Sequence, residues 1–289
     1  MRNHIAARLA GTADKGFLPK QGWLSAFQKG FGSTEQDPDK LVTMANIVEA
    51  IGEYERSQVF VETPWKHYVG GNDRAISGEA KLGALLFYRP YEEGGANCVS
   101  CHRGDFFTDE DFHVMAVPQI GRGKNDGPNG RGDIGRSDIS RFLSDQYKFR
   151  TPTLLNVEVT GPWGHSGAYT SLEAMVRHMA NPARALAAYD EGQLGDQIPP
   201  VQLAYRDENS ALALARLEAN RAAGRTHFQP VDLTDQEVGQ IVAFLKTLTD
   251  PCVKDRECLK PWFFEAQTVG KEDVDGLMLR AIDHRRSPL

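Results

Sequence analysis

The pentapeptide Cys98-Val99-Ser100-Cys101-His102 constrains this chain more than any other feature of its sequence. Two cysteines, two intervening residues and an adjacent histidine form the C-x-x-C-H pattern by which c-type haem is attached. In this pattern each cysteine sulfur bonds one vinyl group of the porphyrin, and the histidine falls beneath the iron. Chance is a weak explanation in a chain with 4 cysteines, and a thioredoxin-like redox pair would not need the histidine. The sequence therefore predicts one covalent haem c, held by Cys98 and Cys101, with His102 as the proximal iron ligand.

Composition and charge exclude several classes of partner. The 289 residues carry a formal net charge of −6, which argues against a nucleic-acid-binding protein and against a basic face that binds anionic lipid. The longest apolar runs, such as residues 241–245, fall far short of the roughly 20 residues that a transmembrane helix needs. We therefore expect no nucleic acid partner and no membrane span.

The first residues of the chain do not have the pattern of a secretion signal. Residues 1–10 contain no charged region followed by a long apolar stretch and a cleavage site. Haem c, however, is attached outside the cytoplasm. We therefore predict a periplasmic protein whose leader has been removed, or whose Met1 is an internal methionine.

The periodicity around the motif predicts helices joined by long loops. Ser77 is a candidate N-cap for a helix that carries Leu82, Leu85 and Leu86 on one face. Residues 121–135 are rich in glycine, asparagine and aspartate, which predicts a long irregular loop. The expected fold class is mainly α-helical: a c-type cytochrome haem domain with long loops and almost no sheet.

The second iron ligand has several candidates downstream of the motif. Residues 170–173 fit a capping box that opens a helix through Met179, and Met175 and Met179 lie on the apolar face of this helix. Taken alone, this spacing favours two core methionines over a methionine bound to iron. The side chains that stay candidates on sequence alone are His113, Met115, His165, Met175, His178 and Met179.

Six short segments carry motifs that are weak signals one by one but specific when taken together in this order. They are residues 83–87, 98–102, 149–157, 160–167, 172–179 and 242–249. In this order the chain resembles the bacterial dihaem cytochrome c peroxidase family, which includes the methylamine-utilisation (MauG-type) haem enzymes. The resemblance implies an oxidoreductase in which a haem c domain delivers electrons for the reduction of hydrogen peroxide to water. It also implies a small cytochrome c or cupredoxin as electron donor, and it is compatible with a homodimer.

The resemblance also assigns roles to single residues. Met179 falls where the family's peroxidases place the methionine ligand of the C-terminal haem, and where the MauG-type enzymes place a tyrosine, so Met179 becomes the favoured distal iron ligand. His165 matches a histidine in the loop before that helix and is expected near the haem, as a neighbour of the cofactor rather than an iron ligand. Thr160 and Pro162 match positions whose backbone carbonyls help to bind calcium. A calcium ion is therefore implied as a second cofactor.

The same resemblance divides the chain into three parts. Residues 1–74 are similar to the end of the family's N-terminal, peroxide-binding domain and carry no haem motif, residues 75–262 form the C-terminal haem domain, and residues 263–289 form a polar tail. The two remaining cysteines, Cys252 and Cys258, are expected to form a local disulfide in an oxidising compartment.

Three functions stay open at this point. The favoured one is the electron-transferring part of a dihaem peroxidase, because residues 1–70 resemble part of a second domain. The first alternative is a single-haem electron carrier without peroxidase activity. The second is an enzyme that oxidises a partner protein, as MauG-type enzymes do, and a methionine rather than a tyrosine at position 179 disfavours it. No residue of this sequence is assigned to the cleavage of peroxide.

Overall fold

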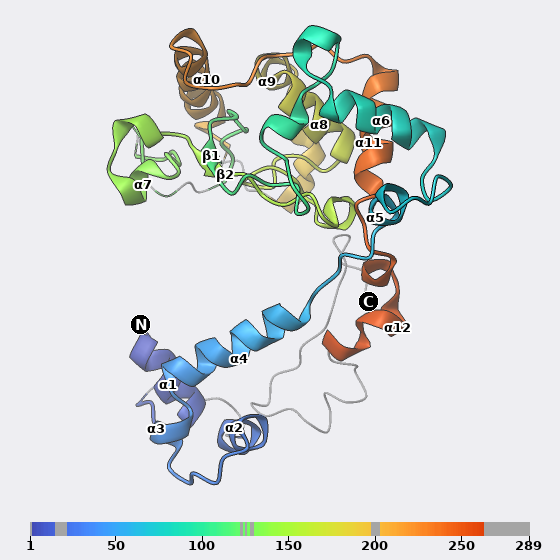
Figure 1. Cartoon of the computed structure of the whole chain (residues 1–289). Coiled ribbons are helices and arrows are strands. Elements are labelled where there is room, and N and C mark those ends of the chain that lie inside the picture. The colour runs from blue at the N-terminus through green and yellow to red at the C-terminus, as the bar shows by residue number, and fades with distance from the viewer. Residues whose placement is uncertain are drawn as a thin grey trace. The chain divides into compact units, whose positions relative to one another are not determined.

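The computed structural model of the chain describes residues 2–14, 22–121, 124, 126–127, 130–197 and 203–262. Contacts divide these residues into two compact units: residues 2–59 with 252–262, called here the smaller unit, and residues 60–251, called here the larger unit. Helices dominate both units and strand is minimal (Figure 1). The expectation of a mainly α-helical fold is therefore confirmed. The predicted tail, residues 263–289, lies outside the described residues.

The smaller unit packs short helices around a compact apolar cluster. Phe27, Leu41, Val42 and Ile47 are its buried members. The predicted disulfide between Cys252 and Cys258 is present, with a Cα–Cα distance of 5.3 Å. The helices of this unit are α1 (Arg2–Ala10), α2 (Trp23–Phe31), α3 (Pro38–Leu41), α4 (Met44–Ser57) and α12 (Arg256–Leu259).

The larger unit contains the C-x-x-C-H motif and the predicted distal ligand. Its one described sheet is a pair of two-residue antiparallel strands, with Phe112 opposite Arg150 and His113 opposite Phe149. Its helices and strands are α5 (Pro64–Val69), α6 (Gly78–Tyr88), β1 (Phe112–His113), α7 (Ser137–Ser140), β2 (Phe149–Arg150), α8 (Leu172–Ala180), α9 (Pro182–Ala187), α10 (Arg206–Ala222) and α11 (Asp235–Lys246).

Helix α6 begins where the sequence predicts it but buries a different face. The Ser77 side chain accepts a hydrogen bond from the backbone N–H of Ala80, which confirms the N-cap. Leu82 and Leu85 are 45% and 52% exposed, so the predicted leucine face is wrong. The buried residues of the helix are Ala80, Gly83, Ala84 and Phe87. Small residues are buried here because another helix approaches the backbone of α6 closely.

That second helix is α11, and the two make the most extensive helix contact among the described elements (Figure 1). A Cβ atom on Gly83 would lie 1.9 Å from the carbonyl oxygen of Gln240. The crossing therefore requires a residue without a side chain at position 83. Helix α11 itself begins with the predicted capping box, in which the Thr234 hydroxyl and the Glu237 carboxylate exchange hydrogen bonds with each other's backbone N–H.

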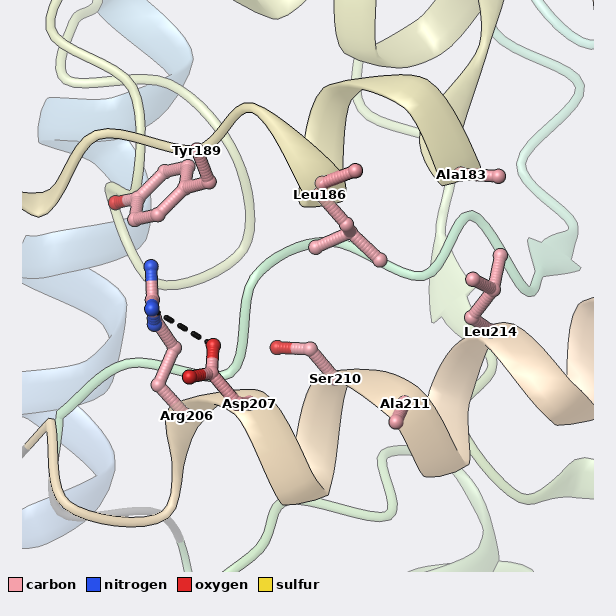
Figure 2. A pocket seen from close by; sticks show the side chains of 9 residues that line it. Ala183, Leu186, Tyr189, Arg206, Asp207, Ser210, Ala211 and Leu214 are labelled. Atoms are coloured by element: carbon pink, nitrogen blue, oxygen red, sulfur yellow. Dashed lines mark ion pairs between the residues drawn. The ribbon is translucent and has the colours of Figure 1, made fainter.

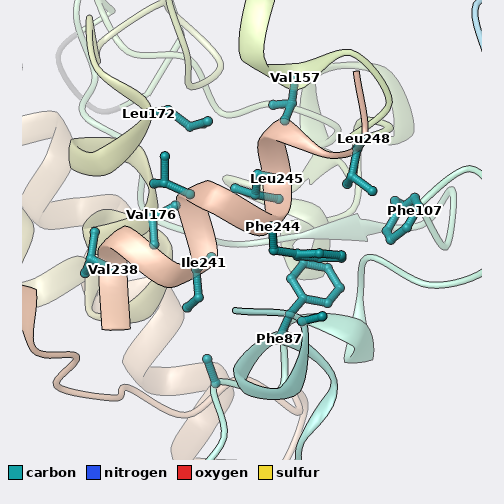
Figure 3. Packing of buried hydrophobic residues seen from close by; sticks show 13 residues of the cluster. Phe87, Phe107, Val157, Leu172, Val176, Val238, Ile241, Phe244, Leu245 and Leu248 are labelled. Atoms are coloured by element: carbon teal, nitrogen blue, oxygen red, sulfur yellow. The ribbon is translucent and has the colours of Figure 1, made fainter. Parts of the chain in front are cut away.

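The core of the larger unit forms around this crossing (Figure 3). Phe244 is fully buried, and its ring lies 5.0 Å from that of Phe87 and 4.9 Å from that of Trp65, measured between centroids. Trp65 precedes the predicted domain boundary at residue 74. The compact units instead divide between residues 59 and 60, because Trp65 packs into the core of the larger unit. The assignment of the N-terminal residues to a second cytochrome domain stays a prediction.

Candidate haem attachment site

The C-x-x-C-H motif forms one tight turn at the end of α6. Asn97 enters it with a left-handed backbone, φ 47°, a conformation that asparagine tolerates better than most residues. The backbone N–H of His102 then donates to the carbonyl of Cys98 at 2.9 Å. The backbone N–H of Ala96 donates to Leu86 at 2.8 Å, which fastens the turn to the last part of α6. Both cysteines and the histidine are therefore held on a single turn next to the helix crossing.

The imidazole of His102 is oriented by the backbone of Phe107 and, more weakly, by that of Pro152. Its Nδ1 lies 3.0 Å from the carbonyl oxygen of Phe107. Because a carbonyl only accepts, Nδ1 donates, and Nε2 is left as the nitrogen with a lone pair. Burial lowers the pKa of His102, so the ring is neutral at physiological pH. A neutral imidazole with one nitrogen tied to a carbonyl is the form in which histidine binds metals.

The two cysteines fit thioether attachment. Both are free thiols and partly buried. Burial of its sulfur raises the pKa of Cys98 to about 12, so this thiol stays protonated. Cys98 and Val99 pack against the same apolar cluster as Leu154 and Leu155. An apolar macrocycle bonded to both sulfurs would lie against this surface, so the side chains present fit a covalent haem.

A polar cluster adjoins the second cysteine. The sulfur of Cys101, one oxygen of Asp109 and one nitrogen of His113 lie within 4.8 Å of one another. The His113 Nε2 is 2.8 Å from the Asp109 carboxylate. A hydrogen bond with Cys101 and the charge of its sulfur, followed by the hydrogen bond and charge of Asp109, raise the pKa of His113 to about 9 against the opposing effect of burial. His113 is thereby engaged with Asp109, which makes it a poor candidate for the distal iron ligand.

Helix α8 carries the methionines and starts one residue later than predicted. Ser171, not Thr170, is the N-cap, and its hydroxyl accepts from the backbone N–H of Ala174. Met175 packs into a cluster with Val117, Ile120, Ala168 and Tyr169. The other face of α8 packs against a different cluster. Its buried residues Leu172 and Val176 belong to the cluster that Cys98 contacts.

His178 is fully buried and uses both ring nitrogens. Nδ1 lies 2.8 Å from the hydroxyl of Tyr169, and Nε2 lies 2.8 Å from the carbonyl oxygen of Met115. Burial lowers the pKa of His178 to about 4, so the ring is neutral. With both nitrogens occupied, His178 has none to offer to iron. Met179 is the next residue and is partly buried.

His165 lies near the surface and is held by two neighbours. Its Nε2 is 3.0 Å from the carboxylate of Asp133, and its ring lies against that of Phe149, with centroids 3.8 Å apart. Burial alone would raise the pKa of Asp133, but the hydrogen bonds from His165 and from the Gly135 backbone, together with the charges of His165 and Lys124, lower this pKa overall. Thr160 and Pro162, the predicted carbonyl ligands of calcium, are both exposed. The predicted roles of these residues stay predictions.

A separate pocket lies between α9 and α10, away from the motif (Figure 2). Its volume is about 250 Å³. Arg206 lies over the ring of Tyr189 and pairs with the carboxylate of Asp207, so its charge is already compensated. The remaining lining is mostly small and apolar, and no motif in the sequence marks this pocket. We attach no role to it.

The contacts around the motif were not visible in the sequence. His102 is paired with a backbone carbonyl, and His178 is paired with a second backbone carbonyl and with the hydroxyl of Tyr169, a residue that no sequence motif marks. Asp109 was likewise missed as the carboxylate beside His113. Backbone acceptors carry no signature in side-chain identity, and the tyrosine is recognised only once the loop before α8 is folded back on the helix.

No protein-family model matches the chain. Among curated proteins it is 28% identical over 163 residues to methylamine utilization protein MauG of Methylophilus methylotrophus, covering 56% of this chain and 43% of that protein. It is 29% identical over 188 residues to cytochrome c551 peroxidase of Pseudomonas aeruginosa, covering 64% of this chain and 46% of that protein. The chain thus spans about half the length of the curated relatives it matches.

Solved structures with a similar fold include proteins of the same kinds. A MauG-like protein associated with microbial copper homeostasis shares the fold with a TM-score of 0.56 at 21% identity, covering 91% of this chain and 66% of that one. The Y463M variant of the diheme peroxidase BthA from Burkholderia thailandensis gives a TM-score of 0.50 at 25% identity, covering 79% and 55%.

Crossed helices α6 and α11, with a C-x-x-C-H turn packed beside them, define the class of the larger unit as a c-type cytochrome domain. The relatives and the structural neighbours narrow this class. The chain is similar to MauG proteins, to cytochrome c peroxidases and to a diheme peroxidase, and the resemblance inferred from its sequence motifs is confirmed.

Proposed function

We propose that this chain is an electron-transfer part of a cytochrome c peroxidase family oxidoreductase. Haem c would be bonded to Cys98 and Cys101, with His102 and Met179 as its iron ligands. When bound, this group supplies one-electron oxidation and reduction. In the complete enzyme the electrons serve the reduction of hydrogen peroxide to water, a reaction that consumes two electrons and therefore suits a protein that stores one beside a second redox centre.

One observation carries this proposal: the motif turn and the helix of Met179 share one apolar cluster. Cys98 and Val99 contact the cluster to which Leu172 and Val176 of α8 belong. His102 is tied through Nδ1, which leaves Nε2 for a metal. Methionine is a soft donor that favours reduced iron and raises its reduction potential, as expected of an electron-transferring centre.

Met179 is favoured as the distal ligand because the other candidates are already held by hydrogen bonds or by packing contacts elsewhere. His113 is bound to Asp109, His165 to Asp133, and His178 to two partners. Met115 and Met175 both pack toward Ala168 and Tyr169 in a different cluster. The remaining candidate, Met179, is a partly buried residue in the last turn of α8, the helix that also contributes Leu172 and Val176 to the cluster beside the motif.

The remaining parts of the proposal concern location and partners. None of the described helices has both the length and the apolar character needed to cross a bilayer. Attachment of haem c and the disulfide in the smaller unit both suit an oxidising compartment, so we place the protein in the periplasm. A small cytochrome c or cupredoxin is the proposed donor, with hydrogen peroxide as the final acceptor. Carbonyls of Thr160 and Pro162 are the proposed protein ligands of a calcium ion.

A steady-state assay tests the function. The 289 residues contain a single C-x-x-C-H motif, so we expect the haem-loaded chain to take one electron per polypeptide from a reduced small cytochrome. Oxidation of that cytochrome by added hydrogen peroxide should stay slow. Fast peroxide turnover by this chain would contradict an electron-transfer role. Failure to accept an electron from any small donor would contradict it as well.

The axial ligand has its own test. In the oxidised, haem-loaded protein, a methionine ligand gives a weak near-infrared sulfur-to-iron absorption band. We expect Met179→Ala to lose this band and to lower the reduction potential, because the soft sulfur donor is removed. Met175→Ala is the matched control, since it removes the other methionine of the same helix. Loss of the band in Met175→Ala and its survival in Met179→Ala would reverse the assignment.

A further inference from the structure

We infer that His178, held by Tyr169 and the Met115 carbonyl, is the positioning residue that directs Met179 at its binding site. The inference rests on the proposed function, because it concerns how the proposed distal ligand is aimed. It adds a role that the family resemblance does not assign, for a histidine that the sequence offered only as a candidate ligand. In this proposal His178 does not contact the iron itself. It acts through Met179, the next residue in the chain.

The hydrogen bonds of His178 have one direction each. The Met115 carbonyl oxygen, 2.8 Å from Nε2, can only accept, so Nε2 donates. In the neutral ring Nδ1 is then an acceptor, and the Tyr169 hydroxyl at 2.8 Å donates to it. His178 has no exposed surface and Tyr169 is 3% exposed, so water does not compete for these bonds. The hydrogen bonds at the two ring nitrogens therefore fix the orientation of the imidazole ring.

The groups that hold His178 are themselves immobilised. Tyr169 exchanges two backbone hydrogen bonds with Trp163, at 2.8 and 3.0 Å. Its ring meets that of Tyr189 edge-on, with centroids 5.5 Å apart. Met115 lies between the buried residues Val114 and Ala116. His178 thus connects the last turn of α8 to two segments that have further contacts of their own.

His178 lies in the last turn of α8, directly before Met179. The helix ends at Ala180, and Asn181 caps it, so Met179 lies in the last turn. Last turns fray, because their carbonyls have no further intrahelical partner. Consecutive helical residues are separated by about 100° of rotation and about 1.5 Å of rise. Fixing His178 therefore fixes the direction in which the Met179 side chain leaves the backbone.

A purely structural role for residue 178 would not need the two ring nitrogens of a histidine. A phenylalanine would fill the same volume, and burying an imidazole is unfavourable unless both nitrogens are satisfied. The directed bonds provide an orientation that apolar packing alone does not. The prediction is therefore specific to hydrogen bonding, not to the presence of a bulky ring at position 178.

The test measures how often the distal position is open. An added ligand such as imidazole can bind iron only when the methionine has left, so its apparent affinity reports the open population. His178→Phe leaves the Tyr169 hydroxyl and the Met115 carbonyl unsatisfied, and we expect imidazole to bind the oxidised protein roughly tenfold more tightly. The near-infrared methionine band should weaken in parallel. His178→Gln can donate and accept at similar positions and should restore much of the wild-type behaviour.

Two further variants keep the test decisive. Tyr169→Phe removes one hydroxyl and keeps the ring, so it should shift imidazole affinity in the same direction by less, even where His178→Phe folds poorly. Ile47→Ala removes a buried side chain from α4 of the smaller unit and serves as the control for lost packing. It should lower the stability of that unit and leave imidazole affinity unchanged. A change in imidazole affinity in Ile47→Ala as large as in His178→Phe would overturn the positioning role.

The outcomes separate this inference from the proposed ligand. If Met179→Ala binds imidazole more tightly than wild type while His178→Phe and Tyr169→Phe do not, only the positioning role is overturned. If Met179→Ala equals wild type in both affinity and spectrum, the proposed ligand is wrong and the positioning role falls with it.

Discussion

Replacing Gly83 with alanine is expected to lower the free energy of unfolding of the larger unit by about 3 kcal/mol. The added Cβ would lie 1.9 Å from the carbonyl oxygen of Gln240 and 2.4 Å from its carbonyl carbon. These are backbone atoms of α11, so no side chain can rotate away, and the two helices must separate. Urea unfolding followed by far-UV circular dichroism measures the change, with and without haem.

Gly78→Ala is the matched control for this prediction. Gly78 begins the same helix, and a Cβ built there meets no heavy atom within 4 Å. Alanine has the higher helix propensity, so this variant should be neutral or slightly more stable. A Gly83→Ala protein within about 1 kcal/mol of wild type would show that the crossing tolerates a side chain and that the helices can shift apart at low cost.

Replacing both Cys98 and Cys101 with serine is expected to abolish covalent attachment of haem. Serine hydroxyls do not add to the porphyrin vinyl groups, and the chain has no other free cysteine, because Cys252 and Cys258 are joined to each other. Mass spectrometry of protein matured in a cytochrome-assembling host should show the polypeptide plus one haem for wild type. The double variant should show the polypeptide alone.

A control and a contrary result sharpen this experiment. Replacing Cys252 and Cys258 with serine breaks the disulfide of the smaller unit, which lies outside the unit that contains the motif, and should leave haem attachment intact. A wild-type protein with only the bare polypeptide mass would remove the basis of the proposed function. A double variant that still carried the haem mass would move the attachment site away from the motif.

Local sequence signals were reliable where a few adjacent residues decide the structure. The caps at Ser77 and Thr234 are examples, since each depends on a side chain reaching a backbone N–H three residues away. The disulfide closes a short loop and was equally local. The cap of α8 was misplaced by one residue because Thr170 and Ser171 are both good caps, and only the fold selects between them.

Predictions that depended on burial were less successful. The leucines of α6 have the spacing of a core face, yet α11 packs against the glycine and alanine side of that helix. Periodicity identifies an apolar stripe but does not reveal how closely the neighbouring helix approaches. The boundary of the larger unit shifted for a related reason, as Trp65 finds its contacts with Phe244, far along the chain.

The amino-acid sequence by itself determined the prediction of covalent attachment, because two thiols and an imidazole at this spacing form the pattern of a haem c site. It also determined the prediction of a helical class and the family resemblance. Only the tertiary structure decided how the candidate ligands differ, since His165 meets Asp133 and His178 meets the Met115 carbonyl, both from other segments of the chain. Hydrogen bonds between distant segments depend on three-dimensional packing, which leaves no periodic trace along the chain.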